Sequence, residues 1–274
     1  MCVAAAGCAA SGKAAGRAAA GEATRRAGPD EAWVALEPGL DLGEFPATRP
    51  SERGDSIVRV LRVDPNRFDL RLMNASAPGQ ERALSAKDWC SRVDLVAAVN
   101  ASMYQTDHRT SESLMRTAEH VNNPRLSKDR AVLAFDRLDD SVPPVALIDR
   151  DCDDFESLRG KYGTLVQSIR MISCRGANVW SQQPQRSSTA AIGRDARGRV
   201  LLIHARSPYS THDLIDILLE LPLGLERAMY VEGGPEAQLY VNSGGSEREW
   251  VGGDDNRRAW PVPNVIGIAR RAAR

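Results

Sequence analysis

The chain has 274 residues, of which 42% are hydrophobic and 26% charged, with 36 basic residues against 36 acidic ones. This length is enough for one large domain with a well-buried core or for two small ones. A net charge of zero argues against nucleic acid as the main partner, because a protein that follows a phosphate backbone needs an excess of Lys and Arg on one face.

The N-terminal segment differs from the rest of the chain. Ala and Gly dominate residues 1–32 and no apolar periodicity is visible, so we predict a disordered leader there. It is too short and too weakly apolar for a signal-peptide core or a membrane span. The letters "AAAGC", ending at Cys8, resemble the end of a bacterial lipoprotein signal. Two alternatives are therefore equal. The protein is either exported to the cell envelope with a lipid anchor through Cys8, or it is cytoplasmic.

The five cysteines show neither CxxC spacing nor the His-Cys spacing of a metal site. We therefore predict no metal, and we expect Cys90, Cys152 and Cys174 to be buried thiols. One disulfide would fit an exported protein.

In the first half of the chain, residues 57–74 are predicted to form a hairpin. Apolar and charged residues alternate after Phe68, and "DPN" at 64–66 is a turn sequence. Ser85 and Asp88 have the spacing of a capping box, which predicts a short helix over 84–94. A buried strand is expected over 95–104, followed by a polar loop.

In the second half, one helix stands out. Residues 207–224 can be capped by Ser210 or Thr211, and Leu214, Ile215, Leu218 and Leu219 form an apolar stripe at helical spacing. The other expected elements are strands at 131–135 and 145–149, a helix at 152–163, a strand at 164–173, a hairpin at 188–207, and a strand, sharp turn and strand at 229–241. Because strands outnumber helices and short turns join them, we predict an α+β fold: a single domain over 33–274 with a largely antiparallel or mixed sheet flanked by a few helices.

Polar residues gather where the predicted strands end, which is a common place for binding groups. Glu232 ends an apolar run and is followed by two glycines, whose amides could approach an anion closely. An apolar setting would raise the pKa of Glu232 and suit it to proton transfer near neutral pH. The structural alternatives are an acidic turn for Glu232, a core histidine for His204 and a buried structural amide for Asn100.

Several segments, taken together, resemble the phosphodiester glycosidase family. They are "AAVNASMY", "RSSTAAIGRDARGRVLLIHARS", "STHDLIDILLEL" and "AMYVEGGPEAQLYVNSGG", and the likeness covers about residues 55–270. Glu232 stands where the family pattern has Asp, and Ser102 where it has Gly. In the segment "QSIRMI", only Gln167 and Ser168 agree with the family pattern. The residues that the resemblance points to are Asn100, Arg186, Thr189, His204, Glu232, Gly233 and Gly234.

The resemblance implies a hydrolase that cleaves a glycosyl phosphodiester, such as a sugar-1-phosphate diester in a cell-wall or surface glycan. The expected catalytic residues are Glu232, His204 and Asn100, with Glu232 as acid or base. Arg170 and Arg186 would bind phosphate oxygens, and we expect no cofactor. The other expected substrate-binding residues are Ser168, Thr189, Gly233 and Gly234. A noncatalytic protein that binds an envelope glycan or phosphopolymer is the main alternative, and a structural surface protein is a third.

Overall fold

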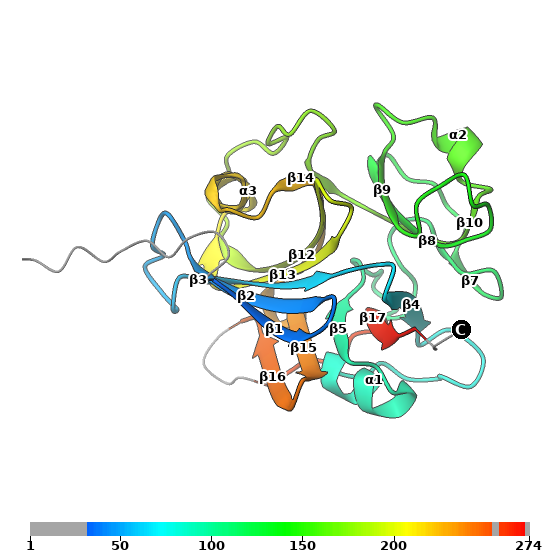
Figure 1. Ribbon diagram of the computed structural model, residues 1–274, viewed down its shortest axis with the longest axis horizontal. Coiled ribbons are helices and arrows are strands. Elements are labelled where there is room, and N and C mark those ends of the chain that lie inside the picture. Colours follow the sequence, from blue (N-terminus) through cyan, green and yellow to red (C-terminus); the bar gives the residue numbers. More distant parts are fainter. Residues whose placement is uncertain (1–31, 254–257, 272–274) are drawn as a thin grey trace, which may run out of the picture.

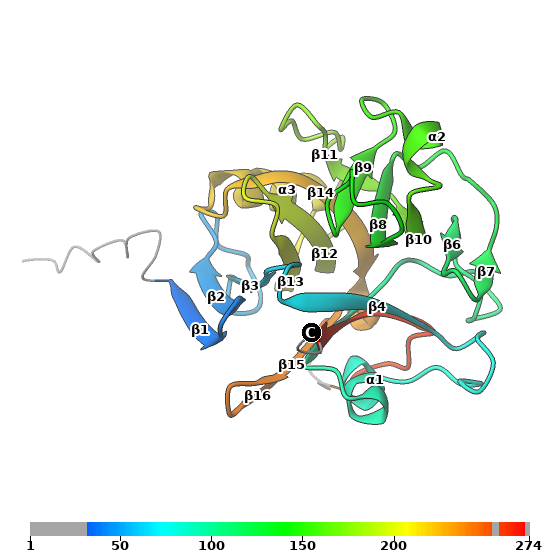
Figure 2. The same ribbon diagram turned by 45° about the vertical axis from the view of Figure 1, so that its right-hand side comes forward.

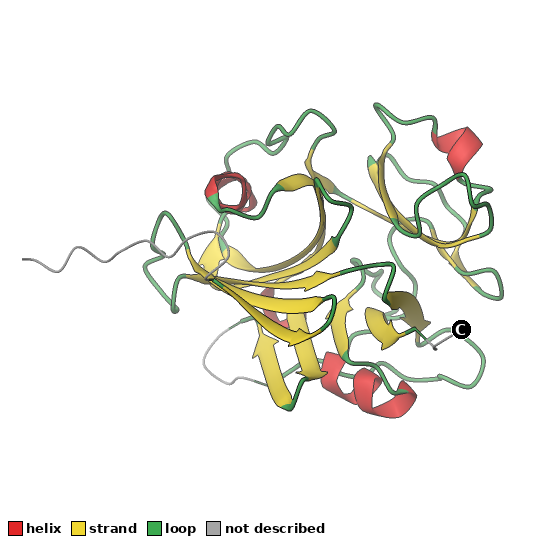
Figure 3. Cartoon of the chain, in the orientation of Figure 1, coloured by secondary structure: helices red, strands yellow, loops and turns green. Residues whose placement is uncertain are grey.

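The computed structural model describes residues 32–253 and 258–271, and strands dominate it (Figure 3). All strand pairs in these residues are antiparallel. The predicted excess of antiparallel strands is therefore confirmed. The strands form three sheets rather than one, and the molecule is more strongly β than the predicted α+β class suggests.

The three sheets are large and differ in composition. In order across the first sheet lie β1 (Trp33–Glu37), β2 (Leu40–Pro46), β3 (Ile57–Val63), β13 (Val200–Tyr209), β12 (Ser187–Asp195), β14 (Leu225–Gly233) and β11 (Arg170–Ile172). The second sheet has β7 (Val121–Asn123), β6 (Met115–Arg116), β10 (Tyr162–Ser168), β8 (Ala131–Arg137) and β9 (Ala146–Asp149). The third has β16 (Ser246–Val251), β15 (Gln238–Ser243), β5 (Ala97–Asn100), β17 (Asn264–Arg270) and β4 (Phe68–Asn74).

One central core joins the three sheets. It contains Ile192 from the first sheet, Leu133 from the second and Val99 from the third, all almost completely buried. Each sheet also contributes to a second apolar cluster, which includes residues of one helix. Figures 1 and 2 show where the three helices lie. The helix α3 (Thr211–Glu220) covers the first sheet, α2 (Phe155–Leu158) the second and α1 (Ala86–Val93) the third.

Both predicted helix caps are confirmed. The Ser85 side chain accepts a hydrogen bond from the amide of Asp88 at 3.1 Å, and Ser210 does the same for Asp213 at 3.1 Å. These bonds satisfy amides that the first turn of a helix leaves free. The predicted helix at 152–163 is shorter than expected, because α2 ends at Leu158 and β10 begins at Tyr162.

The hairpin predicted over 57–74 is wrong, although both of its strands exist. The chain turns at Asp64, whose carbonyl accepts hydrogen bonds from the amides of Arg67 and Phe68. However, β3 pairs with β2 and β13 in the first sheet, whereas β4 pairs with β17 in the third. Alternation identifies a strand but not its partner, since the partner is fixed by long-range packing.

Two further strand predictions have different outcomes. The hairpin at 188–207 is confirmed, because β12 and β13 pair along most of their length. The single strand predicted at 164–173 is divided at Ile169. Its first part, β10, belongs to the second sheet, and its second part, β11, belongs to the first.

The stretch from β14 to β15 also passes between sheets. β14 ends at Gly233 in the first sheet, a short 3-10 turn, η1 (Gly234–Glu236), follows, and β15 starts at Gln238 in the third. Gly234 has φ +65°, a conformation that residues with a Cβ rarely adopt. The predicted sharp turn is thus the corner where the chain moves from one sheet to another.

The expectation of buried thiols is wrong for two cysteines, because Cys152 and Cys174 form a disulfide. Cys90 is buried and free, as predicted. The predicted leader and Cys8 lie outside the described residues. No helix of the described residues is long and apolar enough to cross a membrane.

Candidate active site

Glu232 lies near the end of β14, close to an irregularity in the pairing with β12. Ala190 of β12 faces Glu232, its neighbour Ala191 faces Tyr230, and the register shifts between them. The Oε1 atom of Glu232 accepts a hydrogen bond from the amide of Gly233 at 3.0 Å. Burial nevertheless raises the pKa of Glu232 to about 7, and the nearby charge of Glu236 acts in the same direction. Glu232 is therefore poised to exchange a proton near neutral pH.

Three more side chains complete a cluster that we call the acidic corner: Glu232, Glu236, Tyr104 and Tyr230. The hydroxyl of Tyr104 donates to Oε1 of Glu236 at 3.4 Å. Burial, helped by the charges of Glu236 and Glu232, raises the pKa of Tyr104 to about 12. Burial and the same two carboxylates raise the pKa of Tyr230 as well. Both phenols are thus neutral hydrogen-bond donors at neutral pH.

The glycine after Glu232 is needed for close packing. A Cβ at Gly233 would overlap the hydroxyl of Tyr230 and would lie 3.0 Å from Oγ of Ser187. Gly233 is therefore in close contact with the phenol of Tyr230 and with the start of β12. This contact explains why a small residue follows the carboxylate.

His204 and Asn100 lie behind the acidic corner and hold its backbone. His204 is completely buried, and its Nε2 lies 3.1 Å from the carbonyl oxygen of Ala237, which requires a proton on Nε2. Burial lowers the pKa of His204 to about 4, so the ring is neutral at pH 7. Oδ1 of Asn100 accepts from the amide of Gln238 at 3.1 Å. Both side chains contact backbone at the start of β15.

Three buried polar atoms of this region have no hydrogen-bond partner among the described residues. They are Nδ2 of Asn100, Nδ1 of His204 and Oγ1 of Thr189. Buried polar groups in proteins usually have a partner, so these atoms are candidates for contact with water or a ligand. Thr189 faces Gly233 across the strand pair, which places it next to the corner.

A pocket of about 850 Å³ opens beside the same turn. Gly234 and Pro235 of η1, which lie between Glu232 and Glu236 in the chain, belong to its wall. The remaining wall residues are Arg53, Gly54, Asp55, Arg186, Ser187, Ser188, Arg206, Pro208, Gly252, Gly253, Arg258 and Trp260. Arginine is thus the commonest charged residue of the wall, and Arg186 is the predicted site residue among them.

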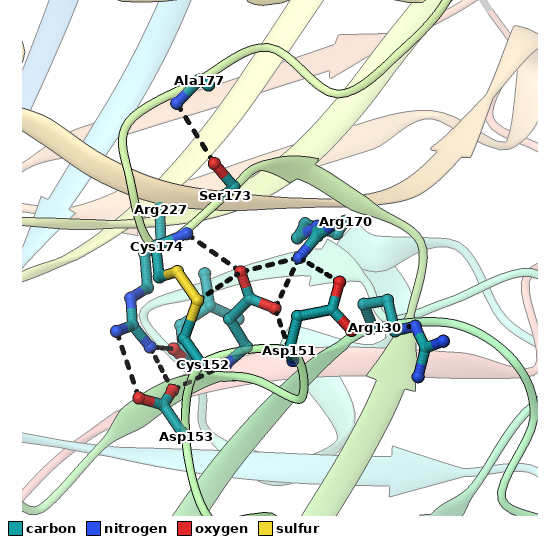
Figure 4. The surroundings of a disulfide bond; sticks show 11 residues. Arg130, Asp151, Cys152, Asp153, Arg170, Ser173, Cys174, Ala177 and Arg227 are labelled. Atoms are coloured by element: carbon teal, nitrogen blue, oxygen red, sulfur yellow. Dashed lines mark hydrogen bonds and ion pairs between the residues drawn. A yellow bond between two sulfur atoms is a disulfide. The ribbon is translucent and has the colours of Figure 1, made fainter.

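Arg170, which is predicted to bind phosphate, does not line this pocket and is surrounded by carboxylates instead. Its Nη1 lies 2.7 Å from Oδ1 of Asp149 and 2.9 Å from Oδ2 of Asp151, next to the Cys152–Cys174 disulfide (Figure 4). These carboxylates already neutralise the guanidinium, and Asp149 is buried. Arg170 is not among the described residues that line the arginine-rich pocket, and its ion pairs favour a structural role over phosphate binding, which stays a prediction.

Ser168 also serves the fold. Its hydroxyl donates to the carbonyl oxygen of Tyr230, which links the end of β10 to β14 just before Glu232. The structure thus brings Glu232, Gly233, Gly234, Thr189, His204 and Asn100 together, with Arg186 in the adjoining pocket. Sequence reasoning missed Glu236, although it follows Glu232 by four positions in "EGGPE", and it missed Tyr104, which ends "VNASMY".

The potential metal ligands are few in the described part of the chain. The single group of three with suitable spacing is Asp149, Cys152 and Cys174, and its two sulfurs are joined in the disulfide. This group therefore does not constitute a metal site.

The fold and the site define a class: a three-sheet antiparallel β protein with a carboxylate at a glycine-rich corner beside an arginine-lined pocket. The sequence model of the phosphodiester glycosidase family matches residues 94–269. The chain belongs to this family, which confirms the resemblance seen in the sequence. No curated protein matches the chain.

Two solved structures share the fold. The catalytic domain of zebrafish N-acetylglucosamine-1-phosphodiester alpha-N-acetylglucosaminidase, auto-inhibited by its pro-peptide, aligns with a TM-score of 0.63 at 14% identity, over 87% of this chain and 86% of that one. A hypothetical protein from Synechocystis aligns with a TM-score of 0.60 at 13% identity, over 87% of this chain and 63% of that one. At these identities the likeness establishes the fold alone.

Proposed function

We propose that the protein is a hydrolase that cleaves a glycosyl phosphodiester between the anomeric carbon of the sugar and the phosphate oxygen. The observation that carries the proposal is the partly buried carboxylate of Glu232, two residues before the part of η1 that lines a pocket rich in arginines. Burial raises the pKa of this carboxyl to about 7. Membership of the phosphodiester glycosidase family supports the same reaction class.

The substrate would lie across η1. Arg186 in the pocket wall would bind phosphate oxygens, since a guanidinium matches their geometry. The hydroxyls of Ser187 and Thr189 would contact the same end of the substrate. The sugar would then extend from the pocket over the acidic corner.

Glu232 would act as the base that removes a proton from the attacking water. The departing phosphate monoester needs little protonation, because its second pKa is about 6. Water is the reactant that needs activation, and a carboxylate with a pKa near 7 is a stronger base than an ordinary one. Glu236 and Tyr104 would position Glu232 and the sugar, while His204 and Asn100 would hold the corner without contacting the reacting atoms.

We also propose that the substrate belongs to a cell-wall or surface glycan. The Cys152–Cys174 disulfide supports an exported protein, because disulfides persist mainly in oxidising compartments. The lipid anchor at Cys8 stays a separate prediction.

The function is tested by assaying the wild type and Glu232→Gln on aryl-phosphate diesters of several sugar-1-phosphates. Loss of the base should lower kcat by roughly 10²–10⁴-fold while KM changes little, because Gln keeps the shape and the acceptor for the amide of Gly233. The matched control is Glu119→Gln, an exposed carboxylate in the loop before β7, which should keep full activity.

Equal activity of Glu232→Gln and the wild type would remove Glu232 from the mechanism. Tight binding of these diesters by the wild type without any turnover would instead contradict the enzyme and favour the noncatalytic glycan-binding alternative.

A further inference from the structure

The wall of the pocket is strongly basic although the whole chain has no net charge. Among the described residues, it contains four arginines, Arg53, Arg186, Arg206 and Arg258, against the single carboxylate of Asp55. Asp55 is already paired, since its Oδ2 lies 2.6 Å from Nη2 of Arg59. In the described residues, no carboxylate forms an ion pair with any of the four arginines, whereas Arg170 and Arg227 have such partners.

This charge exceeds what one phosphodiester can neutralise. A diester carries one negative charge, and one arginine can bind it through two parallel hydrogen bonds. Guanidinium groups that share a pocket repel one another, and the resulting positive potential attracts anions. A ligand with one phosphate would leave most of this potential without a counter-charge.

The pocket also has room for a ligand larger than one phosphate. Its volume of about 850 Å³ is in the range of pockets that hold drug-sized molecules.

Hydrogen bonds hold two parts of the pocket wall in place. The amide of Ser56, beside Arg53 and Gly54, donates to Oγ of Ser207 at 2.7 Å. The carbonyl of Trp260 accepts from Nε2 of Gln238 at 2.7 Å.

We propose that this pocket binds a second phosphate group of the substrate, next to the phosphate at Arg186. Arg53 and Arg206 are the residues that would bind the second group, with Trp260, 51% exposed, against the organic part between or beyond the phosphates. The substrate class is then a glycosyl compound with two neighbouring phosphates, either a diphosphate or two successive diesters of a polymer. The inference rests on the proposed function for the identity of the substrate, but the binding it predicts does not require turnover.

The test is calorimetric titration of the full chain with three sugar-free probes. Dimethyl phosphate supplies one diester charge, methyl diphosphate supplies linked phosphates, and ethylene-bridged bis(methyl phosphate) supplies two separate diesters. At least one of the two-phosphate probes should bind tenfold or more tightly than dimethyl phosphate. Methyl diphosphate as the tighter probe would indicate a diphosphate substrate, and the bridged probe a polymer.

Variants locate the binding. Arg53→Gln and Arg206→Gln should each weaken the preferred two-phosphate probe by tenfold or more. The control Arg175→Gln, an exposed arginine beside the disulfide and outside the pocket, should leave it unchanged. Equal binding of all three probes, or unchanged binding in both pocket variants, would overturn the inference. Two-phosphate binding in a protein that hydrolyses no glycosyl phosphodiester would leave this inference standing and contradict the proposed function.

Discussion

At the scale of single residues, Glu232 combines two opposing influences. Burial favours its neutral form, whereas the hydrogen bond from the amide of Gly233 favours its charged form. Burial prevails, and the pKa rises from 4.5 to about 7. The carboxylate is thus held at a site that reduces the stability of the folded protein at neutral pH, as is common for catalytic groups.

This cost predicts a pH-dependent difference in stability. Glu232 binds its proton more tightly in the folded protein than in the unfolded one, so its contribution to stability is complete below pH 4.5 and is lost as pH rises through 7. Glu232→Gln has no such dependence. Between pH 4.5 and pH 8 the wild type should therefore lose about 3 kcal/mol of unfolding free energy that Glu232→Gln does not lose.

Urea unfolding of both proteins at the two pH values measures this difference. The lowered pKa of His204 acts in the opposite direction, because its contribution is lost as pH falls from 6.5 to 4. It is common to both proteins and cancels in the comparison. A stability difference that is the same at pH 4.5 and pH 8 would show that the pKa of Glu232 is not raised.

The sequence indicated unusual residues, but not the partners that each of them has in the folded chain. Glu232 was predictable because a charge at the end of an apolar run is unusual, and burial then follows from the run itself. The ion pairs of Arg170 could not be predicted, since its partners Asp149 and Asp151 come from another segment and meet it only in the folded chain. The contact of Tyr104 with Glu236 could not be predicted for the same reason, because Tyr104 lies more than a hundred positions before Glu236 in the chain.

At the scale of elements, the corner between β14 and β15 depends on the segment after β16. The carbonyl of Ala237 accepts hydrogen bonds from the amide of Gly252 at 2.7 Å and from His204. A Cβ at Gly252 would overlap the carbonyl oxygen of Gly234 and would lie 2.7 Å from Cβ of Ser188. The corner and the start of β12 leave no space for a side chain there.

Gly252→Ala should therefore push η1 out of place. We expect a loss of stability of about 1–3 kcal/mol, which is typical of overpacking, together with a fall in kcat/KM on any substrate found for the wild type. Thermal unfolding and the diester assay measure the two effects. Gly160→Ala is the matched control, because a Cβ there meets nothing within 4 Å. Equal behaviour of the two variants would mean that the corner is not tightly packed.

The elements themselves were largely predictable, whereas their partners were not. The caps of α1 and α3 and the pairing of β12 with β13 follow from local sequence and were confirmed. The β3–β4 segment looked like a hairpin because both strands and the turn are present. Its strands belong to different sheets, because β3 pairs with β13 and β4 pairs with β17. Both partners come more than a hundred residues later in the chain.

At the scale of the whole molecule, three sheets share one core, and the chain passes between sheets at the place where the site forms. β14 belongs to the first sheet, β15 and Asn100 to the third, and Ser168 ends a strand of the second. The candidate site therefore assembles only when all three sheets have packed. The family was recognisable because its segments keep their order along the chain, while the three-sheet arrangement was not.

The central claim is that the protein is a glycosidase acting on a phosphodiester, and the fate of the oxygen from water tests it most directly. The wild type should be incubated with a glycosyl phosphodiester in water enriched in oxygen-18, and the products analysed by mass spectrometry. Attack at the anomeric carbon predicts that the label appears in the released sugar and not in the phosphate. Label in the phosphate would show cleavage of the phosphorus–oxygen bond and would contradict the account.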